Sequence, residues 1–341
     1  MGSAPVVDSR WYAEMLGAPF VSLEEALRAR LPQPAVRVVM RVGLLRGIAL
    51  GALAYRAPAV GVIKNTPGAL VAAAIAAARP PRSRLVFVEF IRRPPPRLRW
   101  KRLVYLVLFQ LLERPLVRRG MAAGQVLTQM ELDDYPTVYG LPRSRFQLVR
   151  WALRAGEEDI PAPPDHGDLV LASGRTSCDW ETLFAAAAGR PWHLTVVCAP
   201  HDLDRVEALN RDGRARVRSE VPGEEYRELL RASGAYALVL REEGSSAGHG
   251  RLRAAIDAGV PVIASGVRAL EDYVERGETA IVVPPADAEA LRSGIDAVLE
   301  DRELAARLSE RAAERGRRWT YADYFDAIRR LLLPDGGRGR R

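Results

Sequence analysis

A loop rich in small residues opens directly into a predicted helix, and this arrangement suits the binding of an anion. Leu252, Ala255 and Ile256 recur at helical spacing, and Gly259 stands where that helix should end. The first N–H groups of a helix lack intrahelical partners and carry the positive end of its dipole, so we expect a phosphate there. The glycines can instead serve only a tight strand-to-helix turn. The residues expected around the phosphate are Ser245, Ser246, Ala247, Gly248 and His249.

Short apolar runs flank this loop and recur along the chain between helical patterns. Such runs are typical of strands that are buried on both faces. Their alternation with helices predicts an α/β chain with parallel, doubly wound sheets. We expect strands at residues 57–64, 84–90, 124–129, 146–150, 168–173, 193–199, 215–221, 235–240, 261–265 and 279–283.

The chain should divide into two domains at a proline-rich stretch. With 341 residues, each half is large enough to bury its own core. We expect a Rossmann-like domain over residues 1–156, a linker over 157–167, a second domain over 168–333, and a disordered basic tail over 334–341. Two such domains form a cleft, and doubly wound sheets bind ligands at the carboxyl ends of their strands.

The composition is that of a globular protein, with 48% hydrophobic and 27% charged residues. The net charge of +8 is carried almost entirely by arginine, since Lys64 and Lys101 are the only lysines. We do not expect a nucleic-acid partner, because the sequence contains no recognisable nucleic-acid-binding module. Cys178 and Cys198 are too few for a disulfide framework, and the first residues lack a secretory pattern, so we expect a cytoplasmic protein.

The second half of the chain resembles the donor domain of GT-B retaining glycosyltransferases of family 4, the glycosyl transferases group 1. Residues 168–175, the loop described above and above all residues 261–287 carry the resemblance, which covers roughly residues 165–330. It implies two Rossmann-like domains that face a central cleft, with a nucleotide-sugar donor on the second and the acceptor on the first. It also implies retaining hexosyl transfer to a glycan or lipid-linked acceptor, with the donor as a substrate and neither a metal nor another cofactor required.

Arg175 follows Gly174 at the end of an expected strand and is the main candidate on the donor side. Its guanidinium should clamp the donor diphosphate and stabilise the charge of the leaving group, so we expect a catalytic role; an ordinary surface arginine is the alternative. Glu271 is the acid that the resemblance places after the next strand, or else an ordinary charge at a helix start. His249 either hydrogen-bonds a phosphate or is structural.

Three positions depart from the pattern of the family. Spacing places Cys178 where a basic residue usually helps to hold the diphosphate. Ser246 and Ala254 stand where glutamates usually bind the sugar and the ribose. Glu242 and Glu243 lie a few residues earlier, and a shifted loop would recruit one of them. These departures keep open a second function, that of a non-catalytic glycosyltransferase-like subunit which binds a nucleotide or a partner protein.

Glu89 ends an apolar strand of the first half, and we expect it to face the acceptor hydroxyl from across the cleft, in a catalytic role. Lys64, Asn65 and Glu131 are further candidates on neighbouring strand ends. Each of the four residues has a plain alternative as a helix cap or a solvated side chain.

Asp202 and Asp204 form a D-x-D pair after an expected strand. In a different glycosyltransferase fold, such a pair binds a divalent metal through its carboxylates. Here we expect one of the two to cap the following helix, which should run to Asn210, and we expect no metal site.

Residues 82–119 hold ten arginines and one lysine against Glu89 and Glu113. Within them, residues 103–112 are strongly apolar but fall short of the roughly 20 residues that a spanning helix needs. Basic residues that flank an apolar run are typical of a helix at an anionic membrane surface, here the inner face of the membrane. A helix packed on the sheet with a basic rim is the alternative.

Overall fold

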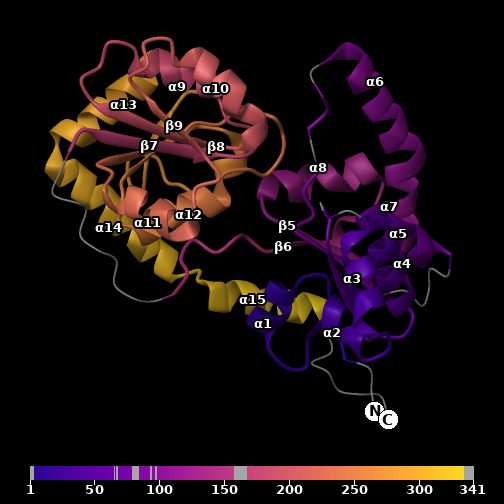
Figure 1. Cartoon of the computed structure of the whole chain (residues 1–341). Coiled ribbons are helices and arrows are strands. Elements are labelled where there is room, and N and C mark those ends of the chain that lie inside the picture. The colour runs from indigo at the N-terminus through magenta and orange to yellow at the C-terminus, as the bar shows by residue number, and fades with distance from the viewer. Residues whose placement is uncertain are drawn as a thin grey trace. The chain divides into compact units, whose positions relative to one another are not determined.

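The computed structural model describes residues 4–156 and 167–333, apart from residues 65, 67, 79–83, 93 and 97. The chain forms two compact units, one of Met1–Arg150 with Tyr324–Arg341 and the other of Trp151–Asp323 (Figure 1). Each unit contains a six-stranded parallel sheet, so the predicted α/β fold with two doubly wound sheets is confirmed. The parts of our predictions that lie outside the described residues are Asn65, Arg82, Arg93, Arg97, most of the linker (157–166) and the tail (334–341).

The first unit is built on a sheet with the strand order β2-β1-β3-β4-β5-β6. The four strands predicted in this half are present as β3 to β6, whereas the two-residue strands β1 and β2 were not predicted. The strands are β1 (Val6–Val7), β2 (Val21–Ser22), β3 (Val60–Ile63), β4 (Leu85–Val88), β5 (Ala123–Val126) and β6 (Phe146–Leu148). The helices are α1 (Arg10–Leu16), α2 (Leu23–Arg28), α3 (Gln33–Arg41), α4 (Gly43–Leu53), α5 (Ala69–Ala77), α6 (Arg99–Leu108), the π-helix η2 (Phe109–Glu113), α7 (Arg114–Gly120), α8 (Gln129–Tyr139) and the short 3₁₀ helix η3 (Arg143–Arg145).

The second unit has the strand order β12-β11-β10-β7-β8-β9, and all six predicted strands are present. The strands are β7 (Leu169–Gly174), β8 (His193–Cys198), β9 (Arg216–Ser219), β10 (Ala235–Leu238), β11 (Val262–Ser265) and β12 (Ile281–Val283). The helices are α9 (Trp180–Ala187), α10 (Leu203–Leu209), α11 (Gly223–Arg231), α12 (His249–Asp257), α13 (Ala288–Glu300) and α14 (Arg302–Arg317), with short 3₁₀ helices at Pro200–Asp202 and Arg268–Leu270. The last helix, α15 (Tyr321–Leu332), begins in this unit and continues into the first.

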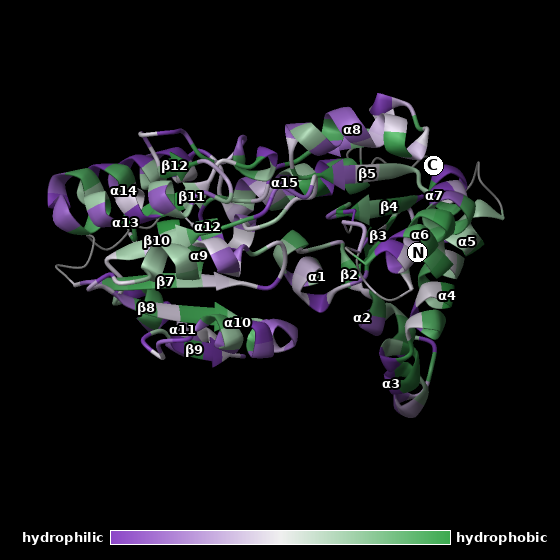
Figure 2. Ribbon diagram, turned by 90° about the horizontal axis from the view of Figure 1, so that it is seen from above, coloured by the Kyte–Doolittle hydropathy of each residue, from purple (hydrophilic) through white to green (hydrophobic). Residues whose placement is uncertain are grey.

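The strands of the second sheet are apolar on both faces because helices cover both. Val170 and Ala172 of β7 pack into one core, while Leu171 between them packs into the other. This alternation follows from the two-residue repeat of a strand. The hydrophobic colour of β7 and β8 is visible in Figure 2. The order of the sheet reverses between β7 and β10, which are adjacent in space but separated by two strands in the sequence.

The boundaries of the two units differ from those predicted at residues 156 and 333. Trp151 already belongs to the second unit, where its N–H donates to the Tyr273 hydroxyl at 2.9 Å. At the other end, Tyr324 belongs to the first unit, where its hydroxyl lies 2.8 Å from that of Tyr12. Helix α15 therefore returns the chain to the first unit, and the second unit ends at Asp323.

Candidate donor site

A cavity of about 670 Å³ lies at the point where the second sheet reverses its order. Ser173 and Gly174 line it from the end of β7, and Leu238 lines it from the end of β10. Open α/β sheets bind their ligands at the carboxyl ends of strands at such a switch point. The volume is in the range of small-molecule sites. Five arginines also line the cavity: Arg175, Arg227, Arg231, Arg251 and Arg253.

Arg175 is exposed at this cavity, directly after Gly174. Within the described part of the chain, its side chain makes no hydrogen bond or ion pair. Its guanidinium is therefore available to a ligand. The structure brings Arg175 and Gly174 together with Gly248 of the predicted phosphate loop.

The loop before α12 needs glycine at residue 248. Gly248 is the N-cap of α12 with a φ of 84°, in the left-handed region, and a Cβ there would lie 2.9 Å from a methyl group of Leu240. The N–H groups of Arg251 and Leu252 both donate to the Gly248 carbonyl. Two further N–H groups of the first turn, those of residues 249 and 250, have no backbone acceptor among the described residues. They remain available to an anion, as expected at a helix start.

The His249 side chain is buried, and its contacts favour the structural alternative. Its Nε2 donates to the Ala269 carbonyl at 2.8 Å, and its ring stacks on Tyr273 with 4.0 Å between the ring centres. Burial lowers the pKa of His249 to about 4, so the imidazole is neutral at pH 7. In this arrangement Nε2 is already used and a neutral Nδ1 has no proton to donate, so the contacts do not favour a hydrogen bond from this side chain to a phosphate.

The other predicted phosphate and donor residues are not among those that line the cavity. Glu271 is exposed and follows a short 3₁₀ helix. It is not among the residues that form the cavity wall. Three further residues are buried and do not line the cavity: Ser245, Ser246 and Ala247.

Cys178 lines the cavity with a buried, neutral thiol. Burial raises its pKa to about 12, so it carries no charge at pH 7. The position where the family resemblance calls for a basic residue is therefore uncharged. Ala254 of α12, which stands at another position that departs from the family pattern, also lines the cavity.

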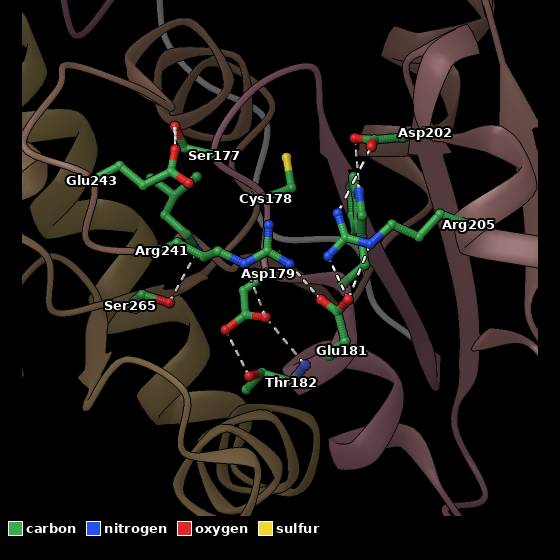
Figure 3. Close-up of polar contacts among 12 residues, drawn as sticks. Ser177, Cys178, Asp179, Glu181, Thr182, Asp202, Arg205, Arg241, Glu243 and Ser265 are labelled. Carbon is green, nitrogen blue, oxygen red and sulfur yellow. Dashed lines mark hydrogen bonds and ion pairs between the residues drawn. The ribbon is translucent and has the colours of Figure 1, made fainter. Parts of the chain in front are cut away.

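A cluster of ion pairs fixes the loop that follows β7 (Figure 3). Arg241, three residues after the end of β10, donates to Glu181 and lies 3.7 Å from the Asp179 carboxylate. Arg205 Nε donates to the same Glu181 at 3.0 Å. Burial alone would raise the pKa of Glu181, but the hydrogen bond from Arg205 and the charges of both arginines lower it to about 2. These contacts connect the ends of β7 and β10, the two strands that form the cavity.

Glu242 and Glu243 are held by neighbouring loops. Glu243 accepts a hydrogen bond from the Ser177 hydroxyl at 2.7 Å (Figure 3). Glu242 accepts one from the Arg268 N–H at 2.8 Å. Neither glutamate lines the cavity. The structure therefore gives no support to a shifted loop that recruits one of them to replace the missing carboxylates.

The D-x-D pair does not cap the helix that follows it. Asp202 stands at the N-cap of α10, but its side chain makes no cap hydrogen bond, so this prediction is wrong for Asp202. Its carboxylate instead accepts from Trp180 Nε1 at 3.1 Å and lies 3.9 Å from Arg205. Asp204 lies exposed in the first turn. Among the described residues, no group of three or more His, Cys, Asp or Glu is placed to hold a metal ion.

On the first unit, Glu89 follows β4 with a φ of 48°, a strained value for a residue with a side chain. Its N–H donates to Gln125 Oε1 at 2.6 Å, and its carboxylate accepts from the Tyr12 hydroxyl at 2.7 Å. Burial raises the pKa of Glu89, and the hydrogen bond from Tyr12 partly opposes that effect. Tyr12 itself contacts Tyr324 of α15. Sequence reasoning missed both tyrosines, because they come from opposite ends of the chain.

The other acceptor-side candidates serve inside the first unit. Lys64 is buried and forms an ion pair of 2.9 Å with Glu113, which also accepts from the Tyr139 hydroxyl. Glu131 is fully buried and accepts a hydrogen bond from the Leu127 N–H at 2.9 Å. Both side chains thus have structural partners.

Solved structures share this architecture over nearly their whole length. A glycosyltransferase from Rickettsia africae ESF-5 is similar with a TM-score of 0.65 and 11% identity, covering 98% of this chain and 100% of its own. Anabaena Alr3699/HepE, solved in complex with UDP-glucose, has a TM-score of 0.68 and 15% identity, covering 97% and 99%. The lipopolysaccharide outer core galactosyltransferase WaaB has a TM-score of 0.62 and 12% identity, covering 98% and 99%. The chain has the GT-B fold.

Residues 203–315 of this GT-B chain match the family model described as Glycosyl transferases group 1. The match lies within the segment for which the sequence predicts that resemblance, and it contains the loop before α12. Arg175 and Glu89 lie outside it. No curated protein shows a significant match to the sequence.

Sequence reasoning missed four of the five cavity arginines. Arg227 and Arg231 lie on α11, and Arg251 and Arg253 lie on α12. Nothing in the local sequence distinguishes them from the other arginines of the chain, so only the positions of these helices beside the cavity identify them. The spacing of Arg251 three residues after Gly248 was the one available signal.

Proposed function

We propose that this chain transfers a sugar from a nucleotide-sugar donor to an acceptor hydroxyl. The observation that carries the proposal is the cavity at the switch point of the second sheet, where Arg175 meets the first turn of α12. A diphosphate needs cationic and N–H donors of this kind. HepE, which shares the fold, was solved with UDP-glucose and with UDP, and we infer a donor of the same class here.

The donor side of the reaction depends on Arg175. Its guanidinium can bind two phosphate oxygens at once. This interaction should be strongest when the bond between sugar and phosphate breaks, because negative charge then grows on the diphosphate. The free N–H groups of the first turn of α12 would share this charge. We assign a retaining hexosyl transfer from the resemblance to the glycosyl transferases group 1.

We propose that the Glu89 carboxylate faces the acceptor hydroxyl and accepts its proton. Its carboxyl is held by Tyr12 on a strained backbone, and strained residues are concentrated at functional sites. A pKa raised by burial makes its carboxylate a better proton acceptor than an exposed one. A plain structural carboxyl is the alternative, and the activity of Glu89→Gln distinguishes the two roles.

The proposed reaction uses no metal ion. Asp202, the first carboxylate of the D-x-D pair, is engaged by Trp180 and lies near Arg205. Arg175 and the backbone N–H groups of the first turn of α12 would instead stabilise the negative charge of the diphosphate. We therefore expect neither a divalent ion nor another cofactor to be required.

We further propose that the acceptor is a lipid-linked glycan met at the inner membrane face, through the surface of α6 and η2. No residue of α6 is buried, and Figure 1 shows this helix standing clear of the sheet of its unit. This exposure supports a role for α6 at a surface over the alternative of a helix packed on the sheet. Of the apolar residues 103–112, Phe109 alone is buried. The most exposed large apolar residues are Trp100 at 64%, Leu103 at 64% and Leu111 at 70%.

The charge around this surface favours an anionic lipid partner. Arg99, Lys101 and Arg102 are exposed at the start of α6, and Arg118 and Arg119 are exposed at the end of α7. Apolar side chains flanked by basic ones lie in the interface of an anionic bilayer. No helix in the described part of the chain combines the length and the apolar character needed to cross a bilayer. WaaB, which shares the fold, is a lipopolysaccharide outer core galactosyltransferase, and we infer a similar kind of acceptor.

A non-catalytic nucleotide-binding subunit is the second candidate function. It is favoured by the residues at three donor-site positions, Cys178, Ser246 and Ala254, where the family resemblance calls for a basic residue and two glutamates. The two functions share the cavity and differ in turnover. They are separated by incubating the purified protein with a panel of nucleotide sugars and measuring both stabilisation and release of the nucleoside diphosphate. Stabilisation with release supports the transferase, and stabilisation without release supports the subunit.

A further inference from the structure

Arg251 is the best-positioned cation in the cavity after Arg175. It lies in the first turn of α12, is half-buried, and lines the cavity wall. Its guanidinium carbon lies 4.7 Å from the centre of the Tyr226 ring. Arginine stacks on aromatic faces while keeping its N–H donors at the edge of the guanidinium plane. The stacked geometry therefore leaves donors for a ligand.

The Tyr226 ring is itself held in place. The Ser173 hydroxyl, at the end of β7, lies 2.8 Å from the Tyr226 hydroxyl and 2.7 Å from that of Tyr236. All three side chains are buried. This cluster fixes the ring against the end of β7, one residue before Gly174 and two before Arg175. The support for Arg251 is therefore rigid and close to the predicted diphosphate site.

The remaining cavity arginines form ion pairs with acids of the protein. Arg227 forms an ion pair with Glu224, and Arg231 lies 3.7 Å from the same carboxylate. Arg253 pairs with Asp257. By contrast, neither Arg175 nor Arg251 forms an ion pair with an acid in the described part of the chain. Two uncompensated cations thus face the same cavity.

The charge of Arg251 acts on Cys178, which stands at the position of the missing basic residue. Cys178 and Arg251 line one cavity. Burial raises the pKa of the Cys178 thiol, and the charges of Arg241 and Arg251 act in the opposite direction. Arg241 is paired with Glu181, which leaves Arg251 as the nearby uncompensated charge.

We propose that Arg251 binds the diphosphate of the donor and supplies, from α12, the positive charge that the loop after β7 lacks at Cys178. With Arg175 it provides two cations for the two negative charges of a nucleotide-sugar diphosphate. This inference rests on the proposed function, since it assigns a residue within the same site. With Arg251 in this role, the cavity would not need a basic residue at position 178 to bind a nucleoside diphosphate.

The test is a calorimetric titration of UDP, ADP and GDP, each paired with its nucleoside, into the wild-type protein and three variants. Arg251→Gln should weaken diphosphate binding by about 10- to 150-fold, the range for a hydrogen bond to a charged group. It should leave nucleoside binding unchanged. Arg251→Lys keeps the charge and should retain most of the affinity. Arg231→Gln is the matched control, because this arginine lines the same cavity but is paired with Glu224.

The outcomes separate this inference from the proposed function. Wild-type binding with an unchanged affinity in Arg251→Gln rejects the role of Arg251 alone. An equal loss in Arg231→Gln means that the general positive potential of the cavity matters, and that also rejects it. Absence of any nucleoside diphosphate binding by the wild-type protein would reject the proposed function instead. If Arg251→Gln lost both nucleoside and diphosphate binding, Arg251 would have a structural role in α12, and its proposed role in diphosphate binding would be rejected.

Discussion

The Sγ atom of Cys178 fills the space in front of Gly174, so that a Cβ on Gly174 would lie 2.1 Å from it. Non-bonded carbon and sulfur atoms do not approach that closely, so the turn between β7 and α9 favours glycine before Arg175. The contact gives Cys178 a packing role in place of the electrostatic role implied for its position. It also sets the path of the backbone that presents Arg175 to the cavity.

Gly174→Ala should destabilise the fold by about 1–3 kcal/mol, the usual cost of overpacking, as measured by urea denaturation. The double variant Gly174→Ala/Cys178→Ala removes the clashing sulfur and should recover most of that loss relative to Cys178→Ala. Gly250→Ala is the control, because no atom lies within 4 Å of a Cβ at that position. A single variant as stable as the wild type, or a double variant with no recovery, would contradict the packing described here.

Glu89→Gln should change the pH dependence of stability. Burial raises the pKa of Glu89 above its ordinary value of 4.5, so the folded state holds the proton more tightly than the unfolded state does. The contribution of this group is complete below the unfolded pKa and is lost as pH rises through the folded pKa. Glutamine keeps an acceptor for Tyr12 but cannot ionise.

Relative to the wild type, Glu89→Gln should therefore gain free energy of unfolding as the pH rises above 4.5, the ordinary pKa of the group. Tyr12→Phe removes the hydrogen bond that favours the charged carboxylate. In this variant the free energy of unfolding should therefore fall more steeply with rising pH than it does in the wild type. Parallel curves for wild type and Glu89→Gln would show that Glu89 is not held as we describe. Full transfer activity in Glu89→Gln would remove it from the acceptor site.

The protein should co-sediment with vesicles that contain anionic lipid, and binding should fall as salt rises. Each basic residue near such a surface contributes about 1 kcal/mol, so the triple variant Arg99→Glu/Lys101→Glu/Arg102→Glu should lose most of the binding. The control is Arg211→Glu/Arg214→Glu/Arg216→Glu, which changes the net charge equally at exposed residues of the second unit. Equal binding to neutral and anionic vesicles, or equal loss in both variants, would reject α6 as the contact surface.

Chelation should leave the transfer reaction intact. Asp202 is engaged by Trp180, and Asn in its place keeps an acceptor for that indole. Asp202→Asn should accordingly retain activity, and EDTA should have no effect on wild type or variant. Activity abolished by EDTA and restored by manganese would overturn the metal-independent mechanism.

The sequence predicted the sheets well because buried parallel strands form continuous apolar runs. The exceptions, β1 and β2, are two residues long and too short to show a pattern. The site was predicted less completely. Arg175 could be found because it follows a strand end, whereas Arg251 is recognisable only when α12 packs beside Tyr226. Likewise, the burial of His249 follows from its stacking on Tyr273, 24 residues later in the sequence, and no local signal reports that contact.

The most direct test of the central claim is nucleoside diphosphate release from a nucleotide-sugar panel by the wild-type protein and by Arg175→Ala, with glycolipid acceptors present. Arg175 is exposed, so the variant should fold normally. We predict that the wild-type protein releases the diphosphate from at least one donor. Arg175→Ala should bind that donor about 1.5–3 kcal/mol more weakly and lose turnover at the same donor concentration. A wild-type protein that neither binds nor consumes any nucleotide sugar, or a variant that binds and turns over as well as the wild type, would contradict the account.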